Sequence, residues 1–90
     1  MFLIFINLGK FTFKFAFKKN LTDASHLFAE CSNLIHIDFS NFNTHKIIDM
    51  NNMFYGCEQL KSLDLTNFNT TKVEDMSEMF SGCQQLSFIK

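Results

Sequence analysis

The chain has 90 residues, of which 47% are hydrophobic and 19% are charged, and this balance excludes a disordered chain while allowing one small domain with a modest core. The formal net charge of −1 gives no general attraction to nucleic acid or to an anionic membrane, so we expect no nucleic-acid partner. No apolar run reaches the ~18–20 residues that span a bilayer, so we expect no transmembrane segment, and no clear signal peptide is present.

The first 20 residues differ in character from the rest of the chain. Residues 1–22 hold four lysines and no acid, whereas residues 23–90 carry a net charge of −5. In residues 11–18 four phenylalanines alternate with smaller or charged residues, which is the period of a β-strand. We therefore expect residues 1–20 to form a Phe-rich cap, either a β-hairpin turning near Gly9 or a single strand. A lipid-facing segment is the rival interpretation, but a period of two does not make an amphipathic helix.

A 26-residue repeat occupies residues 21–90. Residues 31–56 and 57–82 align without gaps and share 13 identities in 26 positions. A fixed period of 20–50 residues indicates units that bury their apolar faces against one another. The recurring positions include Cys31, Cys57 and Cys83, then Phe28, Phe54 and Phe80, then Leu34, Leu60 and Leu86.

Each repeat has two halves with different periods. From Leu60 to Asn67 the spacing L-x-x-L-x-L-x-x-N predicts a short, half-buried strand. Residues 73–83 place apolar side chains at offsets 0, 3, 6, 7 and 10, which predicts one face of a helix. We therefore predict an α/β fold: a short leucine-rich-repeat-like solenoid of strand–helix coils with parallel strands, nearly three repeats long and truncated at the C-terminus.

Three runs of the sequence resemble the BspA-type leucine-rich repeat, the 26-residue repeat of bacterial surface proteins seen in mycoplasmas. They are DMNNMFYGC at 49–57, LDLTNFNT at 63–70 and VEDMSEMFSGC at 73–83. The resemblance implies a location at the cell surface or outside the cell. It also implies an adhesin-like role, in which the chain binds a protein or host-surface ligand without enzymatic activity.

Repeat proteins of this kind bind partners on the exposed face of their strands. With two to three units the face is small beside the roughly 800 Å² per partner of a standard interface, so we expect weak or multivalent binding. By the alternation of the two predicted strands, the partner-binding residues are His36, Asp38, Ser40, Ser62, Asp64 and Thr66.

Cysteines and asparagines recur as columns, which we interpret as structural ladders. Equivalent positions in stacked units lie ~4.7–5 Å apart, so both a disulfide between neighbours and a row of buried thiols remain open. An in-register row does not form the tetrahedron that zinc requires. No spacing pairs a cysteine with a histidine as a nucleophile, so we expect no enzyme and no cofactor. The ladder residues are Cys31, Cys57, Cys83, Asn41 and Asn67.

Acidic residues form two further columns, Asp38 with Asp64, and Asp23 with Asp49 and Asp75. Stacked carboxylates can hold calcium, but two columns do not supply enough ligands. Charges at helix starts and a solvated polar face are the simpler interpretation, and we predict no metal site.

Residues 86–89 begin a further strand and the sequence stops in mid-repeat at Lys90, so we expect the last unit to present an open apolar end. Three interpretations follow: a piece of a longer array, a decayed copy, or a unit that associates with itself through that end. A structural or self-associating capping unit is therefore the alternative to a binding module.

Overall fold

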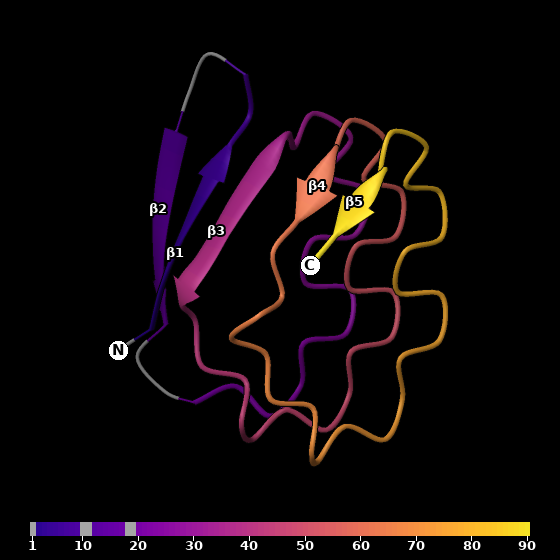
Figure 1. Ribbon diagram of the computed structural model, residues 1–90. Coiled ribbons are helices and arrows are strands. Elements are labelled where there is room, and N and C mark those ends of the chain that lie inside the picture. The colour runs from indigo at the N-terminus through magenta and orange to yellow at the C-terminus, as the bar shows by residue number, and fades with distance from the viewer. Residues whose placement is uncertain (1, 10–11, 18–19) are drawn as a thin grey trace.

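Among the residues that the structure describes, five β-strands in two small sheets make up the regular structure (Figure 1). The computed structural model describes residues 2–9, 12–17 and 20–90. One sheet is antiparallel with the order β2-β1-β3, and the other is a parallel pair, β4-β5. The strands are β1 (Phe2–Asn7), β2 (Thr12–Phe17), β3 (His36–Asn41), β4 (Ser62–Leu63) and β5 (Phe88–Ile89).

The N-terminal strands form a hairpin that lies against the first repeat. β1 and β2 pair over their full length, from Phe2 opposite Phe17 to Asn7 opposite Thr12. Gly9 has a φ of 90° in the connection, a conformation that glycine adopts without strain. β1 then pairs on its other side with β3, so the hairpin extends the first repeat into a three-stranded sheet.

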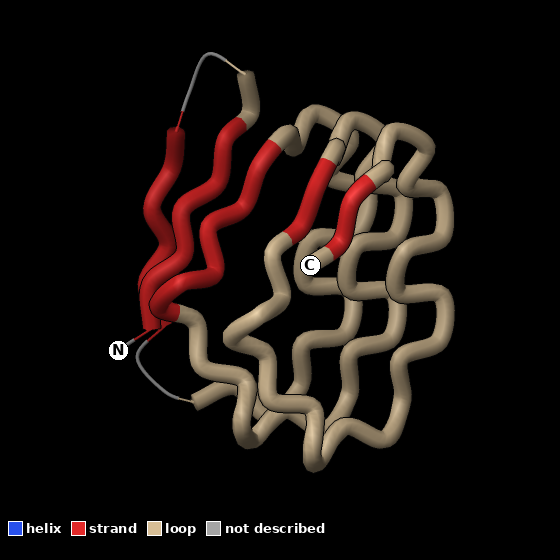
Figure 2. The backbone as a smooth tube through the Cα atoms, viewed as in Figure 1, coloured by secondary structure: helices blue, strands red, loops and turns tan. Residues whose placement is uncertain are grey.

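The prediction of an α/β strand–helix solenoid is wrong. The described ranges contain no helix, and the chain is a small all-β domain (Figure 2). Those ranges therefore also hold no helix long and apolar enough to cross a membrane. The strands also differ from the prediction. β3 pairs antiparallel with β1, and only β4 and β5 form the parallel pair expected of neighbouring repeats.

Left-handed residues explain why the predicted helices do not form. Each repeat has a positive φ at two positions, the first of which is His26, Asn52 or Glu78. The second position lies four residues later and is Glu30, Gly56 or Gly82. A left-handed residue ends an α-helix, so two of them four residues apart leave no room for one.

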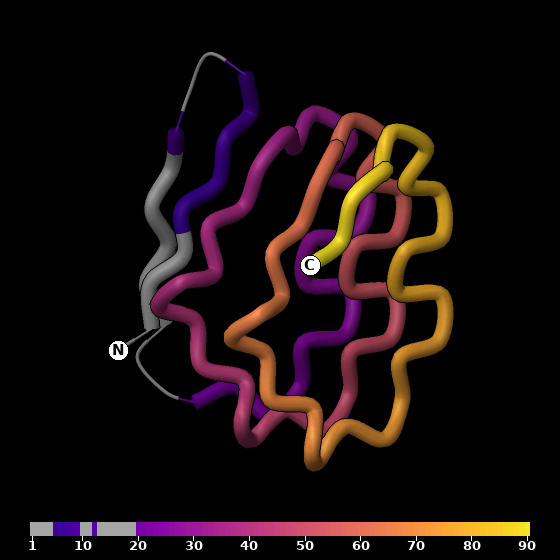
Figure 3. Tube along the Cα trace, in the orientation of Figure 1, coloured from indigo at the N-terminus to yellow at the C-terminus, as the bar shows by residue number. Residues whose placement is uncertain are grey.

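The backbone of these segments bonds to the neighbouring repeat instead. Phe54 N donates to Met79 O at 3.0 Å and Gly56 N donates to Ser81 O at 2.8 Å, while the intervening Tyr55 N closes a tight turn onto Asn52 O at 3.1 Å. The three repeats therefore run side by side as successive tight turns (Figure 3). Tight turns and a helix both bring every third or fourth side chain to the same side, so the apolar spacing fits either.

The core lies between the repeats and is most complete in the middle one. Phe54 is fully buried and stacks between Phe28 and Phe80, with centroids 5.8 Å apart in both pairs. Cys57 and Leu60 are also fully buried. The third repeat has one covered side only, and its side chains are accordingly more exposed: Met76 at 45%, Phe88 at 59% and Ile89 at 47%.

Candidate functional site

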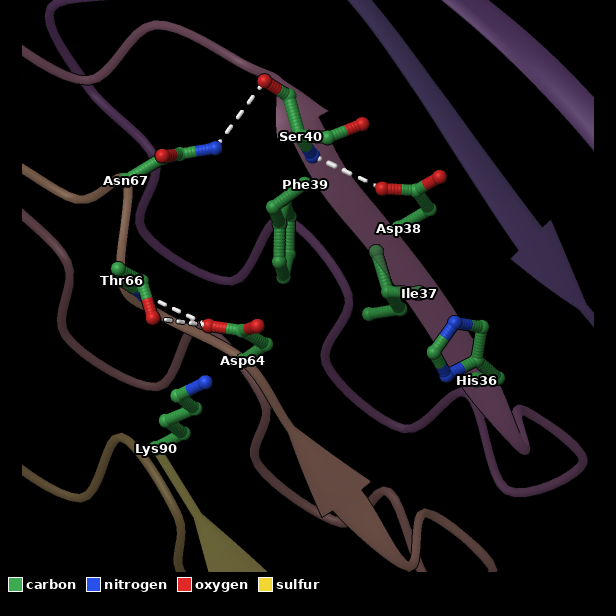
Figure 4. A pocket seen from close by; sticks show the side chains of 9 residues that line it. All are labelled: His36, Ile37, Asp38, Phe39, Ser40, Asp64, Thr66, Asn67 and Lys90. Atoms are coloured by element: carbon green, nitrogen blue, oxygen red, sulfur yellow. Dashed lines mark hydrogen bonds between the residues drawn. The ribbon is translucent and has the colours of Figure 1, made fainter.

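A groove of about 480 Å³ lies between β3 and the segment that follows β4, and we call it the β3–β4 groove (Figure 4). It is bounded on one side by a strand of the antiparallel sheet and on the other by the second repeat, with the end of β5 below (Figure 4). The lining residues are His36, Ile37, Asp38, Phe39, Ser40, Asp64, Thr66, Asn67 and Lys90.

The groove lies where β3 pairs with β1 and does not pair with β4, the corresponding strand of the next repeat. Between the second and third repeats the strand segments are directly bonded: Lys90 N donates to Leu63 O at 2.9 Å, and Leu65 N donates to Lys90 O at 2.9 Å. Over the described residues no equivalent backbone bond joins β3 to β4, and the two belong to separate sheets. The first and second repeats therefore lack backbone bonds between their described strands while remaining bonded through their turns.

Apolar side chains form the floor of the groove. Ile37 and Phe39 alternate along β3 with the polar lining residues and are buried, with 1% and 3% exposure. The ring of Phe39 packs edge-on against Phe68, with centroids 5.0 Å apart, and against Phe54 at 6.0 Å. The floor is thus continuous with the core, which holds the polar walls in place.

Two carboxylates line opposite sides of the groove in the same local geometry. Asp38 Oδ1 accepts a hydrogen bond of 2.9 Å from Ser40 N, and Asp64 Oδ1 accepts one of 3.0 Å from Thr66 N. The bonds from Ser40 lower the pKa of Asp38. The Thr66 hydroxyl and N–H lower the pKa of Asp64, with a smaller contribution from the Lys90 charge. Both groups are therefore ionised at neutral pH.

Polar contacts fix the groove at its two ends. Asn67 Nδ2 donates to Ser40 O at 3.1 Å and so spans the gap where β3 ends (Figure 4). The Lys90 side chain extends toward Asp64 (Figure 4). Its ammonium group thus lies on the side of the groove that carries the second carboxylate.

Five of the six residues predicted to bind partners line this groove. His36, Asp38 and Ser40 come from β3, and Asp64 and Thr66 follow β4. Ser62 does not line it and is half-buried in β4.

Four lining residues fall outside the set predicted to bind partners: Ile37, Phe39, Asn67 and Lys90. Ile37 and Phe39 are apolar positions of the strand pattern, and Asn67 was assigned only to a ladder. The signal for Asn67 was its place directly after the predicted strand, where its side chain reaches the preceding repeat.

The predicted cysteine ladder consists of free thiols. Cys57 Sγ donates to Phe28 O and Cys83 Sγ to Phe54 O, both at 3.1 Å. Burial raises the pKa of Cys57 to about 12, aided by the neighbouring thiols, and burial also raises the pKa of Cys31 and Cys83. These thiols therefore stay protonated and serve as small core groups with a weak donor.

The aspartates of the second predicted column hold turns. Asp23, Asp49 and Asp75 form parallel backbone bridges with one another. Each accepts a hydrogen bond of 2.8 Å at Oδ1 from the N–H two residues later, which belongs to Ser25, Asn51 and Ser77 respectively. Within the described part of the chain, no three His, Cys, Asp or Glu residues group together as metal ligands.

The comparisons with known proteins give one match. A family model described as "Mycoplasma protein of unknown function, DUF285" matches residues 7–88. No curated protein and no solved structure matches the chain. The match covers both the repeats and part of the N-terminal hairpin.

Proposed function

Because the chain belongs to the DUF285 family of mycoplasma proteins, whose function is unknown, we propose its function from the geometry: a non-enzymatic protein-interaction module that binds partners in the β3–β4 groove. The observation that carries the proposal is the groove itself. Polar side chains of two strand segments stand over a buried apolar floor, with carboxylates on both sides.

The size and composition of the groove support a binding role. Its volume falls within the ~300–1,000 Å³ typical of ligand sites. A buried floor with exposed polar walls resembles the arrangement of protein interfaces, where an apolar centre is ringed by polar groups. The small area favours weak or multivalent binding.

The state of the thiols supports a non-enzymatic role. A cysteine nucleophile needs a lowered pKa, and burial moves the pKa of all three thiols in the opposite direction. The side chains of Cys57 and Cys83 are also engaged by backbone carbonyls.

The experiment places a photo-reactive benzoylphenylalanine at Ser40 in the groove, or at exposed Lys72 as a control outside it. Cross-linking is carried out on cells of the source organism and on its host cells. We expect a product from position 40 only, suppressed by excess unmodified chain. A chain with Asp38→Ala, Asp64→Ala and Thr66→Ala should fail to suppress it. Equal suppression by both chains would show that partners bind elsewhere.

A cell-surface location is a further part of this proposal. It rests on the resemblance of the repeats to BspA-type surface proteins and on the mycoplasma description of the family. Protease treatment of intact cells, followed by an immunoblot against this chain, tests the location. Loss of the band supports surface exposure, and a fully protected band contradicts it.

The exposed end of the third repeat favours a second candidate, a self-associating structural unit. Met76, Phe88 and Ile89 are each 45–59% exposed there. Sedimentation across a range of protein concentrations separates the candidates. A binding module stays monomeric, whereas a self-associating unit grows with concentration and is dispersed by Phe88→Ser.

A further inference from the structure

We propose that the β3–β4 groove takes an extended peptide segment with lysine or arginine side chains, which adds to the free edge of β3 as a strand. This inference rests on the proposed function, because it names the class of partner for the same groove. Three features of the groove support it: a strand edge that is only partly paired, an alternating lining and an excess of negative charge.

The first feature is the pair of strand edges that face each other. β3 is the last strand of the order β2-β1-β3, and β4 is the first of the order β4-β5. Elsewhere the repeats join their strand segments directly, as Ser87 N does with Lys61 O at 3.0 Å. In the described structure, the only hydrogen bond between β3 and the segment after β4 is the side-chain bond from Asn67 to Ser40 O. Ser40 N is engaged by Asp38 Oδ1 at 2.9 Å, so the edge open to a peptide is the part of β3 before Ser40. An unpaired edge of this kind is the usual template for an added strand.

The second feature is the pattern of the groove wall. Along β3 the lining side chains alternate between polar and buried apolar groups, in the order His36, Ile37, Asp38, Phe39, Ser40. An extended peptide presents side chains with the same period of two, so it can match polar groups to polar groups along one wall. A helix or a compact ligand has no such period.

The third feature is charge. Asp38 and Asp64 are ionised, and Lys90 approaches only Asp64 (Figure 4). Asp38 is left without a comparable lysine among the lining residues. The His36 ring, which also favours the charged form of Asp38, is its basic neighbour among the described lining residues. The described lining still carries two carboxylates against one lysine, and Lys90 occupies the place where a second ligand cation would pair. Lysine and arginine side chains supply charge-assisted hydrogen bonds to carboxylates and are the complementary groups.

The test is a titration of the ¹⁵N-labelled chain with a synthetic peptide, acetyl-Thr-Val-Lys-Val-Lys-Val-Thr-amide, followed by NMR. We expect saturable shifts of the amides of residues 36–40 and 63–67. A peptide with glutamate in place of lysine tests the charge. A peptide methylated on alternate backbone nitrogens tests strand pairing, because it keeps the side chains but loses donors. Both control peptides should bind at least about tenfold more weakly.

Matched variants of the protein locate the charge. Asp38→Asn with Asp64→Asn removes both groove charges while keeping an oxygen to accept the turn hydrogen bonds. The control is Asp23→Asn with Asp75→Asn, which changes the same two charges in the same type of turn outside the groove. We expect about tenfold weaker binding for the groove pair only. Lys90→Gln should strengthen binding severalfold by freeing Asp64.

The outcomes separate this inference from the proposed function. Equal binding of the lysine and glutamate peptides, or equal loss in both Asp→Asn pairs, overturns it. So does unchanged binding of the methylated peptide, or the absence of shifts in residues 36–40. If these results occur while the Ser40 cross-link persists, the groove binds another class of partner. If both fail, the groove is not the binding site.

Discussion

The Asn67 side chain ties the end of β3 to the second repeat by donating a hydrogen bond of 3.1 Å from Nδ2 to Ser40 O. β3 pairs with β1 and has no backbone bond to β4, and the Asn67 side chain spans the gap between β3 and the segment after β4. The bond therefore helps to set the width of the β3–β4 groove.

Asn67→Ala should loosen the groove without unfolding the domain. Asn67 is exposed, so we expect a loss of about 0.5–1 kcal/mol in the free energy of unfolding, and faster amide exchange in β3. Asn67→Asp should cost more, because its carboxylate would face the Ser40 carbonyl. Urea unfolding and hydrogen exchange measure both. Asn41→Ala is the control, since it occupies the equivalent exposed position one repeat earlier; an equal effect there would contradict a special role for Asn67.

The repeat and the outward face could be predicted from sequence, but the backbone of the turns could not. The 26-residue period is sufficient to group Phe28, Phe54 and Phe80, which the structure stacks. The helix prediction failed because Met53, Phe54 and Cys57 have a spacing that suits tight turns as well as a helix. Gly56 and Gly82 fit the end of a helix equally well. The left-handed residues that exclude the helix are His26, Asn52 and Glu78, and none of them is a glycine that would reveal the turn in the sequence.

The groove was also beyond sequence reasoning, although most of its lining was named. The alternation of polar and apolar residues identifies His36, Asp38 and Ser40 as outward-facing. That identification does not depend on which strand pairs with β3. It does not reveal that β1 takes one edge of β3, because that pairing depends on a non-local contact between Asn7 and His36. The division into two sheets accompanies the pairing of β1 with β3.

Phe54→Ala should remove most of the stability of the domain. Phe54 is fully buried, stacks on two rings and meets Phe39 at 6.0 Å. Truncating such a side chain costs about 3–5 kcal/mol, which is comparable to the whole stability of a small domain. Urea unfolding gives the value. Tyr55→Ala is the control, because the adjacent Tyr55 is 37% exposed. It should lower the free energy of unfolding by well under half as much, and similar losses in the two variants would contradict the packing argument.

Gly82→Ala and Glu30→Gly should shift stability in opposite directions. A Cβ on Gly82, at φ +78°, would lie 3.2 Å from Gly56 Cα, so alanine meets both backbone strain and a close contact. We expect a loss of about 1–3 kcal/mol. Glu30 has a φ of 61°, and glycine would relieve that strain, for a gain of about 0.5–1 kcal/mol.

Thermal unfolding of both variants measures these changes. Gly9→Ala separates strain from crowding, because Gly9 also has a positive φ but the added Cβ would lie 3.7 Å from Ile35 Cδ1, its nearest neighbour among the described residues. A loss at Gly9 as large as that at Gly82 would show that the contact with Gly56 contributes nothing.

The three thiols should react with iodoacetamide at unequal rates in the folded protein. Cys57 is fully buried and burial raises its pKa to about 12, so its thiolate is the scarcest and the least accessible. Cys31 and Cys83 are partly exposed and should react first, though slowly, because their pKa is also raised. Mass spectrometry of digests over time gives the order, and labelling in urea is the control. Rapid labelling of Cys57 in the folded chain would contradict its place in the core.

Acid should destabilise the domain through the aspartates that hold its turns. Hydrogen bonds from the residue two positions later lower the pKa of four of them, Asp23, Asp38, Asp64 and Asp75, from the usual 3.8. A carboxylate with a lower pKa in the folded state stabilises the fold fully above about pH 3.8. That stability is lost as the pH falls through the folded-state pKa values.

We therefore expect the urea midpoint to stay level from neutral pH to about pH 5 and to fall below pH 3.8. Replacing all four aspartates by asparagine keeps an acceptor in each turn but removes the titrating groups, so the midpoint of that variant should change less with pH. An equal fall in the variant and in the unmodified chain would assign the acid sensitivity to other carboxylates.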